Sequence, residues 1–201
     1  IEDISVYVVE IEPSLFELSK EYFRLPDDDR LNNYAEDGRR FLANTEKKYD
    51  LIFGDAYYSR YSIPAHLSTK EFFELSKSKL TDEGIFMGNF LGRFGDTAPS
   101  ILLSEIKTFQ EVFPNSYYIA TSKQKFDGYQ NVVFIGYNSD RKVDFSDLAI
   151  REHENITISG IAEHLVDIGS LDLTEHILFT DNYAPVDYLT AKAIKNTKTA
   201  E

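Results

Sequence analysis

Three acidic residues directly follow runs of apolar and β-branched residues that predict β-strands, and together they could bind a nucleotide-like ligand. They are Glu10, Asp37 and Asp55. In an open α/β sheet, ligands bind beyond the carboxyl ends of the strands, which is where these acids are expected to lie. A carboxylate offers two acceptor oxygens to a vicinal diol, so Glu10 is placed to bind both hydroxyls of a ribose. The arrangement does not by itself specify a reaction.

Each of these acids also has an ordinary structural explanation. Glu10 and Glu12 are favoured near the start of a helix on electrostatic grounds alone. The pair Asp37-Gly38 is common in turns. These alternatives stay open for each acid taken singly, but three acids at successive strand ends favour a ligand.

Strands and helices alternate along the chain, and this alternation positions the acids. Apolar runs predict strands at 5–10, 31–36, 49–55 and, after a turn at 82–84, 85–91. Helical spacing predicts helices at 13–25, 39–45, 69–80 (N-cap Thr69) and 102–113. An antiparallel hairpin is predicted at 116–122 and 131–137. We therefore predict an α/β fold, with a mostly parallel sheet, helices on both faces and an antiparallel C-terminal hairpin.

The pattern loosens beyond residue 140. Short helical pieces are predicted at 144–152 and 160–168, and the polar tail from Lys192 is expected to fray. No internal repeat or low-complexity linker divides the chain. A single domain over residues 1–201 is therefore favoured, with 140–201 as its C-terminal helical extension.

The charge of the chain limits its partners. Its 201 residues include 21 Lys+Arg and 34 Asp+Glu, a formal net charge of −13. Because such a surface repels phosphate backbones, we expect no nucleic-acid partner and favour cationic small molecules as ligands. The 42% of hydrophobic residues can fill a sizeable core, and no apolar run is long enough to cross a bilayer, so no membrane association is expected.

Cysteine and histidine usage limits the chemistry. The chain contains no cysteine, which excludes disulfides and thiolate metal sites and fits a cytoplasmic protein. The sequence places no two of its four histidines close together, so no metal is expected. These histidines are His66, His153, His164 and His176. The only methionine is Met87 and the chain opens at Ile1 within a strand pattern, so we expect it to be a piece of a longer sequence.

Two sets of motifs carry a resemblance to a known family. The first set is Val8-Val9-Glu10-Ile11-Glu12-Pro13, Tyr22-Phe23, Asp29-Arg30-Leu31, Asp37-Gly38-Arg39, Phe41-Leu42, Tyr49-Asp50-Leu51-Ile52 and Asp55-Ala56-Tyr57. The second set is Ile63-Pro64, His66-Leu67, Thr69, Glu71-Phe72-Phe73 and Thr180-Asp181-Asn182-Tyr183-Ala184-Pro185-Val186-Asp187. In order and spacing the first resembles the spermidine synthase (polyamine aminopropyltransferase) family, and the second a bacterial spermidine synthase-like branch of it.

The resemblance implies a Rossmann-like fold of the class I methyltransferase type, of which this chain holds the second strand onward. The first strand, its glycine-rich loop and a small N-terminal β-domain would lie upstream of Ile1. In the family, the acid matching Glu10, here followed by Ile11, binds the ribose, and the residues matching Asp37 and Gly38 hold the adenine. The donor would be decarboxylated S-adenosylmethionine and the acceptor putrescine or a related amine. A homodimer is one expectation for the assembly.

The residue types are consistent with aminopropyl transfer. A sulfonium is already an excellent leaving group, so the reaction needs a deprotonated amine held in line with the carbon next to sulfur. Asp55 would orient that amine and take its proton. Tyr57, Tyr58 and Tyr61 would hold a cationic acceptor through cation–π contacts, with anchoring of a mobile loop as the alternative for each.

Two features leave other functions open. Tyr183 would bind substrate beside the turn Asp181-Asn182, or it would only form part of a plain turn. Family members usually carry a second acid three residues after the catalytic one, and Tyr58 stands there instead. An S-adenosylmethionine-dependent methyltransferase is therefore one alternative, because the same fold and ribose acid serve both donors. A non-catalytic nucleoside-binding or interaction module is the other.

Overall fold

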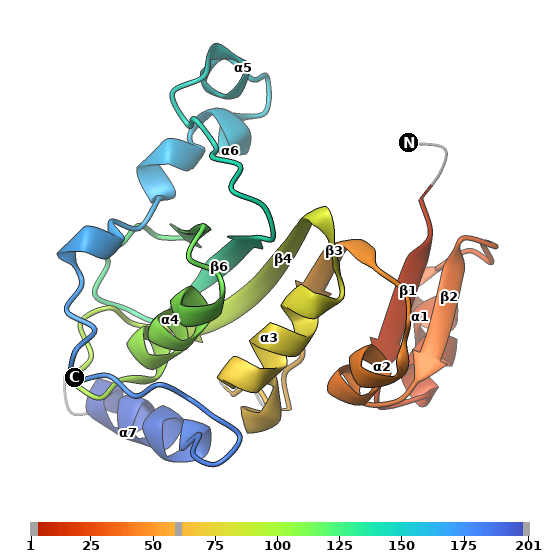
Figure 1. Ribbon diagram of the computed structural model, residues 1–201, viewed down its shortest axis with the longest axis horizontal. Helices are drawn as coiled ribbons and strands as arrows, with labels where there is room; N and C mark the ends of the chain where they lie inside the picture. Colours follow the sequence, from red (N-terminus) through yellow and green to blue (C-terminus); the bar gives the residue numbers. More distant parts are fainter. Residues whose placement is uncertain (1–3, 59–61, 199–201) are drawn as a thin grey trace. The chain divides into compact units, whose positions relative to one another are not determined.

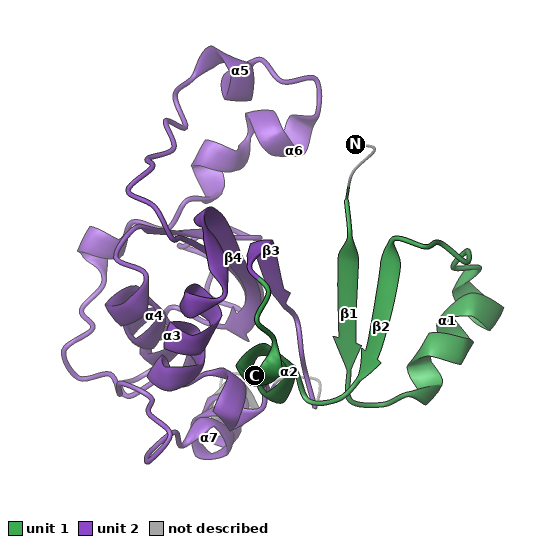
Figure 2. Ribbon diagram, turned by 45° about the vertical axis from the view of Figure 1, so that its right-hand side comes forward, with its two compact units in different colours: residues 1–47 green, residues 48–201 purple. Residues whose placement is uncertain are grey.

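The computed structural model describes residues 4–58 and 62–198, and the side chains of this part up to residue 195. It forms two compact units, Ile1–Lys47 and Lys48–Glu201, which are coloured separately in Figure 2. Each unit combines strands with helices, which confirms the α/β class. The described strand pairs are mixed, two parallel and two antiparallel.

The first unit contains a parallel pair of strands. Strand β1 (Val6–Glu10) pairs with β2 (Leu31–Ala35), and Glu10 lies opposite Ala35. Helix α1 (Ser14–Phe23) joins the two strands, and α2 (Gly38–Asn44) follows the second. Helix α1 ends where Arg24 adopts a left-handed conformation with φ of 54°. The sequence therefore yields one strand–helix–strand–helix unit, as its apolar pattern predicts.

The second unit contains a four-stranded sheet in the order β3-β4-β6-β5. The strands are β3 (Tyr49–Gly54), β4 (Leu80–Gly92), β5 (Ser116–Ala120) and β6 (Gln130–Tyr137). Strands β3 and β4 are parallel, whereas β6 is antiparallel to both of its neighbours. The predicted C-terminal hairpin is therefore confirmed.

An aromatic core holds this sheet against two helices. Helices α3 (Lys70–Ser78) and α4 (Ile101–Val112) cover one face of the sheet in Figure 1. The fully buried ring of Phe109 lies 5.1 Å from that of Phe73 and 5.5 Å from that of Phe134, both in edge-to-face geometry. A Cβ atom on Gly136 would lie 2.5 Å from Phe113, so glycine is required where this helix approaches the sheet. Interlocked rings fix how α4 lies on the sheet.

Two boundaries differ from the predictions. Helix α3 ends at Ser78 instead of Leu80, because Leu80 belongs to β4 and pairs with Tyr49. The turn predicted at 82–84 is wrong, because β4 continues through these residues. They lie where the register between β3 and β4 is irregular. Gly84 permits this, because a Cβ atom there would lie 2.9 Å from the carbonyl oxygen of Tyr49.

The C-terminal tail is also more ordered than predicted. Helix α7 (Val186–Lys198) extends through the segment that was expected to fray from Lys192. Val186, Leu189 and Ala193 are buried against Ile101 and Phe179, so a short apolar stripe binds the polar helix to α4. The short helices of this unit are η1 (Ala65–Leu67), α5 (Leu148–Arg151), α6 (Ile156–Ser159), η2 (Ile161–His164) and η3 (Ile168–Ser170). Within the described residues, no helix combines the length and apolar character needed to span a membrane.

Candidate active site

Two of the predicted acids lie at one edge of the first unit. Parallel pairing of β1 with β2 brings the carboxyl ends of both strands to the same edge, and Asp37 comes two residues after β2. Glu10 Oε1 accepts a hydrogen bond of 3.0 Å from the backbone N–H of Glu12. Asp37 Oδ1 accepts one of 2.9 Å from the backbone N–H of Arg40 and so caps α2. Local backbone donors therefore orient both carboxylates.

The surroundings of these acids are open. The Ile11 side chain is 71% exposed. A Cβ atom on Gly38 would meet no atom within 4 Å, so packing within the chain does not require glycine there. Gly38 therefore faces open space on the side where a side chain would lie.

Asp55 lies in the second unit, directly after β3. Its Oδ1 accepts a 3.0 Å hydrogen bond from Asn89 Nδ2, at the carboxyl end of the neighbouring strand β4. In the parallel register Gly54 lies opposite Gly88, so Asp55 and Asn89 are the next pair along the two strands. The sequence analysis missed Asn89, and its signal is a polar amide within an otherwise apolar strand run.

Tyr57 contacts one member of this pair, Asn89. Its hydroxyl group donates a 2.9 Å hydrogen bond to the carbonyl oxygen of Asn89. Burial raises the pKa of Tyr57, and the charges of Glu105 and Asp55 raise it further. The phenol is therefore a neutral donor at physiological pH. The structure thus brings Asp55, Asn89 and Tyr57 together, and it adds Glu105 of α4, which the sequence analysis also missed.

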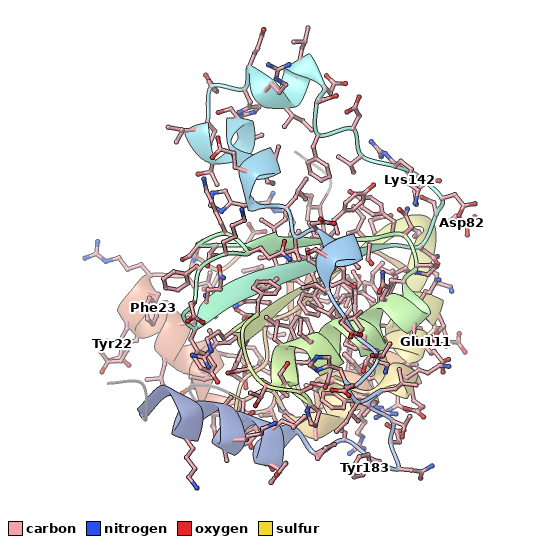
Figure 3. The ribbon with its side chains drawn as sticks, turned by 90° about the vertical axis from the view of Figure 1, so that its left-hand side faces the viewer. Tyr22, Phe23, Asp82, Glu111, Lys142 and Tyr183 are labelled. Carbon is pink, nitrogen blue, oxygen red and sulfur yellow. The ribbon has the colours of Figure 1, made fainter. Side chains whose placement is uncertain are left out.

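The two other predicted tyrosines with described side chains lie on the surface. Tyr58 is 59% exposed, and its hydroxyl group donates a hydrogen bond to the Asp187 carboxylate in the first turn of α7. Tyr183 is also 59% exposed, and Figure 3 shows it at the edge of the second unit. Tyr61 lies outside the described residues. The contact with Asp187 links the loop after β3 to the C-terminal helix.

The turn that carries Tyr183 is bound to the start of α3. Thr69 Oγ1 donates a 2.8 Å hydrogen bond to Asp181 Oδ1. The backbone N–H of Asp181 donates one of 2.9 Å to Glu71 Oε2. Thr69 also caps α3, as predicted, so this turn is held in place by two residues at the first turn of the helix.

The chemistry available at these sites is that of carboxylates, an amide and phenols. The described part of the chain contains no group of three or more His, Cys, Asp or Glu side chains that could hold a metal ion. Glu10 and Asp37 present acceptors suited to hydroxyl and amino groups. Asp55 presents an exposed carboxylate that an adjacent amide orients, and a carboxylate can accept a proton.

These features define an α/β protein with acids at the carboxyl ends of its strands. Residues 4–145 match the sequence model of the spermine/spermidine synthase domain, and the chain belongs to this family. A probable polyamine aminopropyl transferase from Bifidobacterium longum is 36% identical over 107 residues, which are 53% of this chain and 23% of that protein.

Two further similarities are to a methyltransferase in sequence and to a probable spermidine synthase in fold. An eEF1A lysine and N-terminal methyltransferase from Xenopus laevis is 30% identical over 157 residues, 73% of this chain and 21% of that protein. A probable spermidine synthase from Corynebacterium glutamicum superposes with a TM-score of 0.60 at 22% identity, over 73% of this chain and 51% of the other. The chain therefore corresponds to about half or less of the length of these proteins.

Proposed function

We propose that this chain forms part of an aminopropyltransferase, which transfers an aminopropyl group from decarboxylated S-adenosylmethionine to putrescine or a related amine. The observation that carries the proposal is the hydrogen bond between Asn89 and Asp55 beside Tyr57, in a chain that belongs to the spermine/spermidine synthase domain family. An oriented carboxylate at a strand end is what the acceptor amine requires.

The reaction forms one bond and breaks another. The amine nitrogen attacks the carbon next to the sulfonium, a C–N bond forms, and the C–S bond breaks to release methylthioadenosine. The proton leaving the amine goes to Asp55, whose position is fixed by Asn89. Tyr57 stays neutral and borders the amine. Tyr58 and Tyr183 would add aromatic surface for a cationic acceptor.

The donor would be bound by the first unit. Glu10 would accept both ribose hydroxyls, because Oε2 makes no hydrogen bond to the described residues while Oε1 is held by a backbone N–H. Asp37 would accept from the adenine amino group, and the open space beside Gly38 and Ile11 admits the base. These contacts bind adenosine whether the sulfonium carries an aminopropyl group or a methyl group.

The test is transfer of a labelled aminopropyl group from decarboxylated S-adenosylmethionine to a panel of amines. We expect a labelled polyamine and an equal amount of methylthioadenosine. Asp82→Asn is a matched control for Asp55→Asn, because Asp82 is an exposed acid at the opposite end of β4 from Asn89 (Figure 3). No labelled product with any amine would overturn the proposal.

A methyltransferase is the second candidate, because the Xenopus laevis relative is named as one. The two candidates differ in the donor they bind. Thermal shifts measured with S-adenosylmethionine and with its decarboxylated form separate them. We expect the larger shift with the decarboxylated donor, and a larger shift with S-adenosylmethionine would favour methyl transfer.

The proposal extends to the setting of the protein. We place the protein in the cytoplasm. Its proposed partner is a small-molecule polyamine and not a nucleic acid, because the acidic net charge of −13 attracts cations and repels phosphate backbones. A homodimer is the proposed assembly. Sedimentation equilibrium would measure it directly, and a concentration-independent monomer mass would rule it out.

A further inference from the structure

Helix α7 has a fixed position on α4. Its apolar stripe is buried against Ile101 and Phe179. The segment before the helix is bonded to α4, because the backbone N–H of Phe179 donates a 2.9 Å hydrogen bond to Thr108 Oγ1. The backbone N–H of Ile177 likewise donates one of 3.1 Å to Ser104 Oγ. Figure 1 shows α7 beside α4, where it can support neighbouring loops.

Lys192 of α7 binds the loop that follows β4. Its side chain is half-buried, and Nζ donates hydrogen bonds of 3.0, 3.1 and 3.0 Å to the carbonyl oxygens of Thr97, Ala98 and Pro99. An ammonium group has three N–H donors, so these three bonds satisfy it fully. Converging carbonyl dipoles repel one another, whereas hydrogen bonds from a charged donor are strong. The conformation of this loop therefore depends on Lys192.

Asp187 of α7 binds the segment that follows β3. The hydroxyl group of Tyr58 donates a hydrogen bond to the Asp187 carboxylate. The preceding residue, Tyr57, donates one of 2.9 Å to the carbonyl oxygen of Asn89. Two successive tyrosines therefore tie this segment to two elements, Tyr57 to β4 and Tyr58 to α7.

Both of these connections begin at the carboxyl edge of the sheet, where Asp55 lies. Strand β3 ends at Gly54, and β4 ends at Gly92, three residues after Asn89. Because β3 and β4 are parallel, the segments after them leave from the same edge. In open α/β sheets, ligands bind beyond this edge. Helix α7 thus holds the two segments that an amine bound at Asp55 would adjoin.

We propose that Asp187 and Lys192 are positioning residues for the transfer reaction. Asp187 acts through Tyr58, and Lys192 acts through the carbonyl oxygens of residues 97–99. This inference rests on the proposed function and assigns a role in it to the C-terminal helix. Both residues keep the surroundings of Asp55 in one geometry, and a misplacement of about 1 Å can lower a rate by about a hundredfold.

The alternative is that these contacts only add stability. A purely structural contact would change the free energy of unfolding and leave the turnover of the folded protein unaltered. A positioning contact would lower turnover and loosen only its own segment. Asp187 separates the two cases best, because it and Tyr58 are both exposed and surface substitutions usually change stability little.

The test combines turnover with backbone order parameters from NMR relaxation, measured on the full chain. In Asp187→Ala, methylthioadenosine release with 1,4-diaminobutane as acceptor should be slower by about tenfold. Order parameters should fall from about 0.85 to below about 0.6 in residues 56–58 only. Lys192→Met should lower turnover similarly and loosen residues 95–98 instead. Affinity for methylthioadenosine should change by less than about twofold in both variants, since the first unit is proposed to bind the donor.

Conservative variants and a control keep the test specific. Asp187→Asn retains an acceptor for Tyr58, and Lys192→Arg retains a cation for the carbonyl oxygens, so both should recover most of the turnover. Tyr188→Phe is the control, because Tyr188 is on the same helix and is 68% exposed. It should match the unmodified chain in turnover and in order parameters.

Each residue is judged by its own variants. If Lys192→Met does not fold, Lys192→Gln retains two N–H donors without the charge and should show a smaller loss of the same kind. Unchanged turnover, or lower turnover with unchanged order parameters, would overturn the positioning role of that residue alone. No methylthioadenosine release by the unmodified chain with any amine would overturn the proposed function and this inference with it.

Discussion

The two units hold their acids in different ways. In the first unit, Glu10 and Asp37 are half-buried and each accepts a hydrogen bond from a backbone N–H, and among its described residues only Phe41 and Leu42 are buried hydrophobic side chains. In the second unit, Asp55 adjoins a packed aromatic core, and Glu105 is buried within it. Local turns can position a half-buried acid, whereas a fully buried acid needs a rigid scaffold around it. This difference agrees with our proposal that the first unit binds the donor and the second unit recognises the amine.

Removal of one aromatic ring should reveal the largest difference in stability between the two units. Phe109→Ala should lower the free energy of unfolding of the second unit by about 3–5 kcal/mol, because Phe109 is fully buried among five other aromatic rings. Phe41→Ala in the first unit should cost less, since that ring is at the margin of burial with 9% exposure. Chemical denaturation monitored by amide hydrogen exchange would measure the loss of unfolding free energy in both variants. Equal losses would show that the units do not differ in packing.

Glu10→Gln should weaken binding of methylthioadenosine by about tenfold or more, because a carboxylate that accepts two ribose hydroxyls becomes an amide with one acceptor oxygen. Binding of 1,4-diaminobutane should be unchanged. Titration calorimetry measures both ligands, and Glu17→Gln in the first turn of α1 is the control. A loss of amine affinity would contradict the division between the units.

The buried acid should make stability depend on pH. The native pKa of Glu105 lies well above its usual value of 4.5, so the native state retains a proton that the unfolded chain releases. Stability from this group is complete below pH 4.5 and is lost as pH rises toward the native pKa. Glu105→Gln should therefore gain stability relative to the unmodified chain between pH 5.5 and 8. Denaturation at both pH values tests this, and a constant difference would contradict it.

Asp37 allows its two roles to be separated. Asp37→Ala should cost about 1 kcal/mol of stability, because α2 loses its N-cap, and should also weaken nucleoside binding. Asp37→Ser retains a capping oxygen and should keep the stability while nucleoside binding still falls. Thermal unfolding and titration with methylthioadenosine report the two effects. Full binding by Asp37→Ser would show that Asp37 is only a cap.

The sequence predicts the local elements well because their signals are local. Apolar runs defined β1 and β3, and helical spacing together with Thr69 defined α3. Errors arose where tertiary contacts decide. The long β4 depends on a close backbone approach at Gly84, and α7 depends on packing against α4, which spacing within the polar tail does not reveal.

In the candidate site, too, residues with local sequence signals were predicted and residues brought in by tertiary contacts were missed. Acids at strand ends can be identified from the sequence, because a strand and the residue after it are adjacent in the chain. Asn89 and Glu105 come from β4 and α4, which lie far from Asp55 and Tyr57 in the sequence, so only the fold shows that Asn89 bonds to Asp55 and that Glu105 acts on the pKa of Tyr57. An acid in the apolar stripe of a helix is the one sequence signal that Glu105 provides.

The central claim is that Asp55 takes the proton of the acceptor amine. The most direct measurement is the rate of methylthioadenosine release by Asp55→Asn, together with its affinity for methylthioadenosine. We predict a rate lower by about a hundredfold or more with unchanged nucleoside affinity. A rate equal to that of the unmodified chain, or a loss explained entirely by weaker nucleoside binding, would contradict the claim.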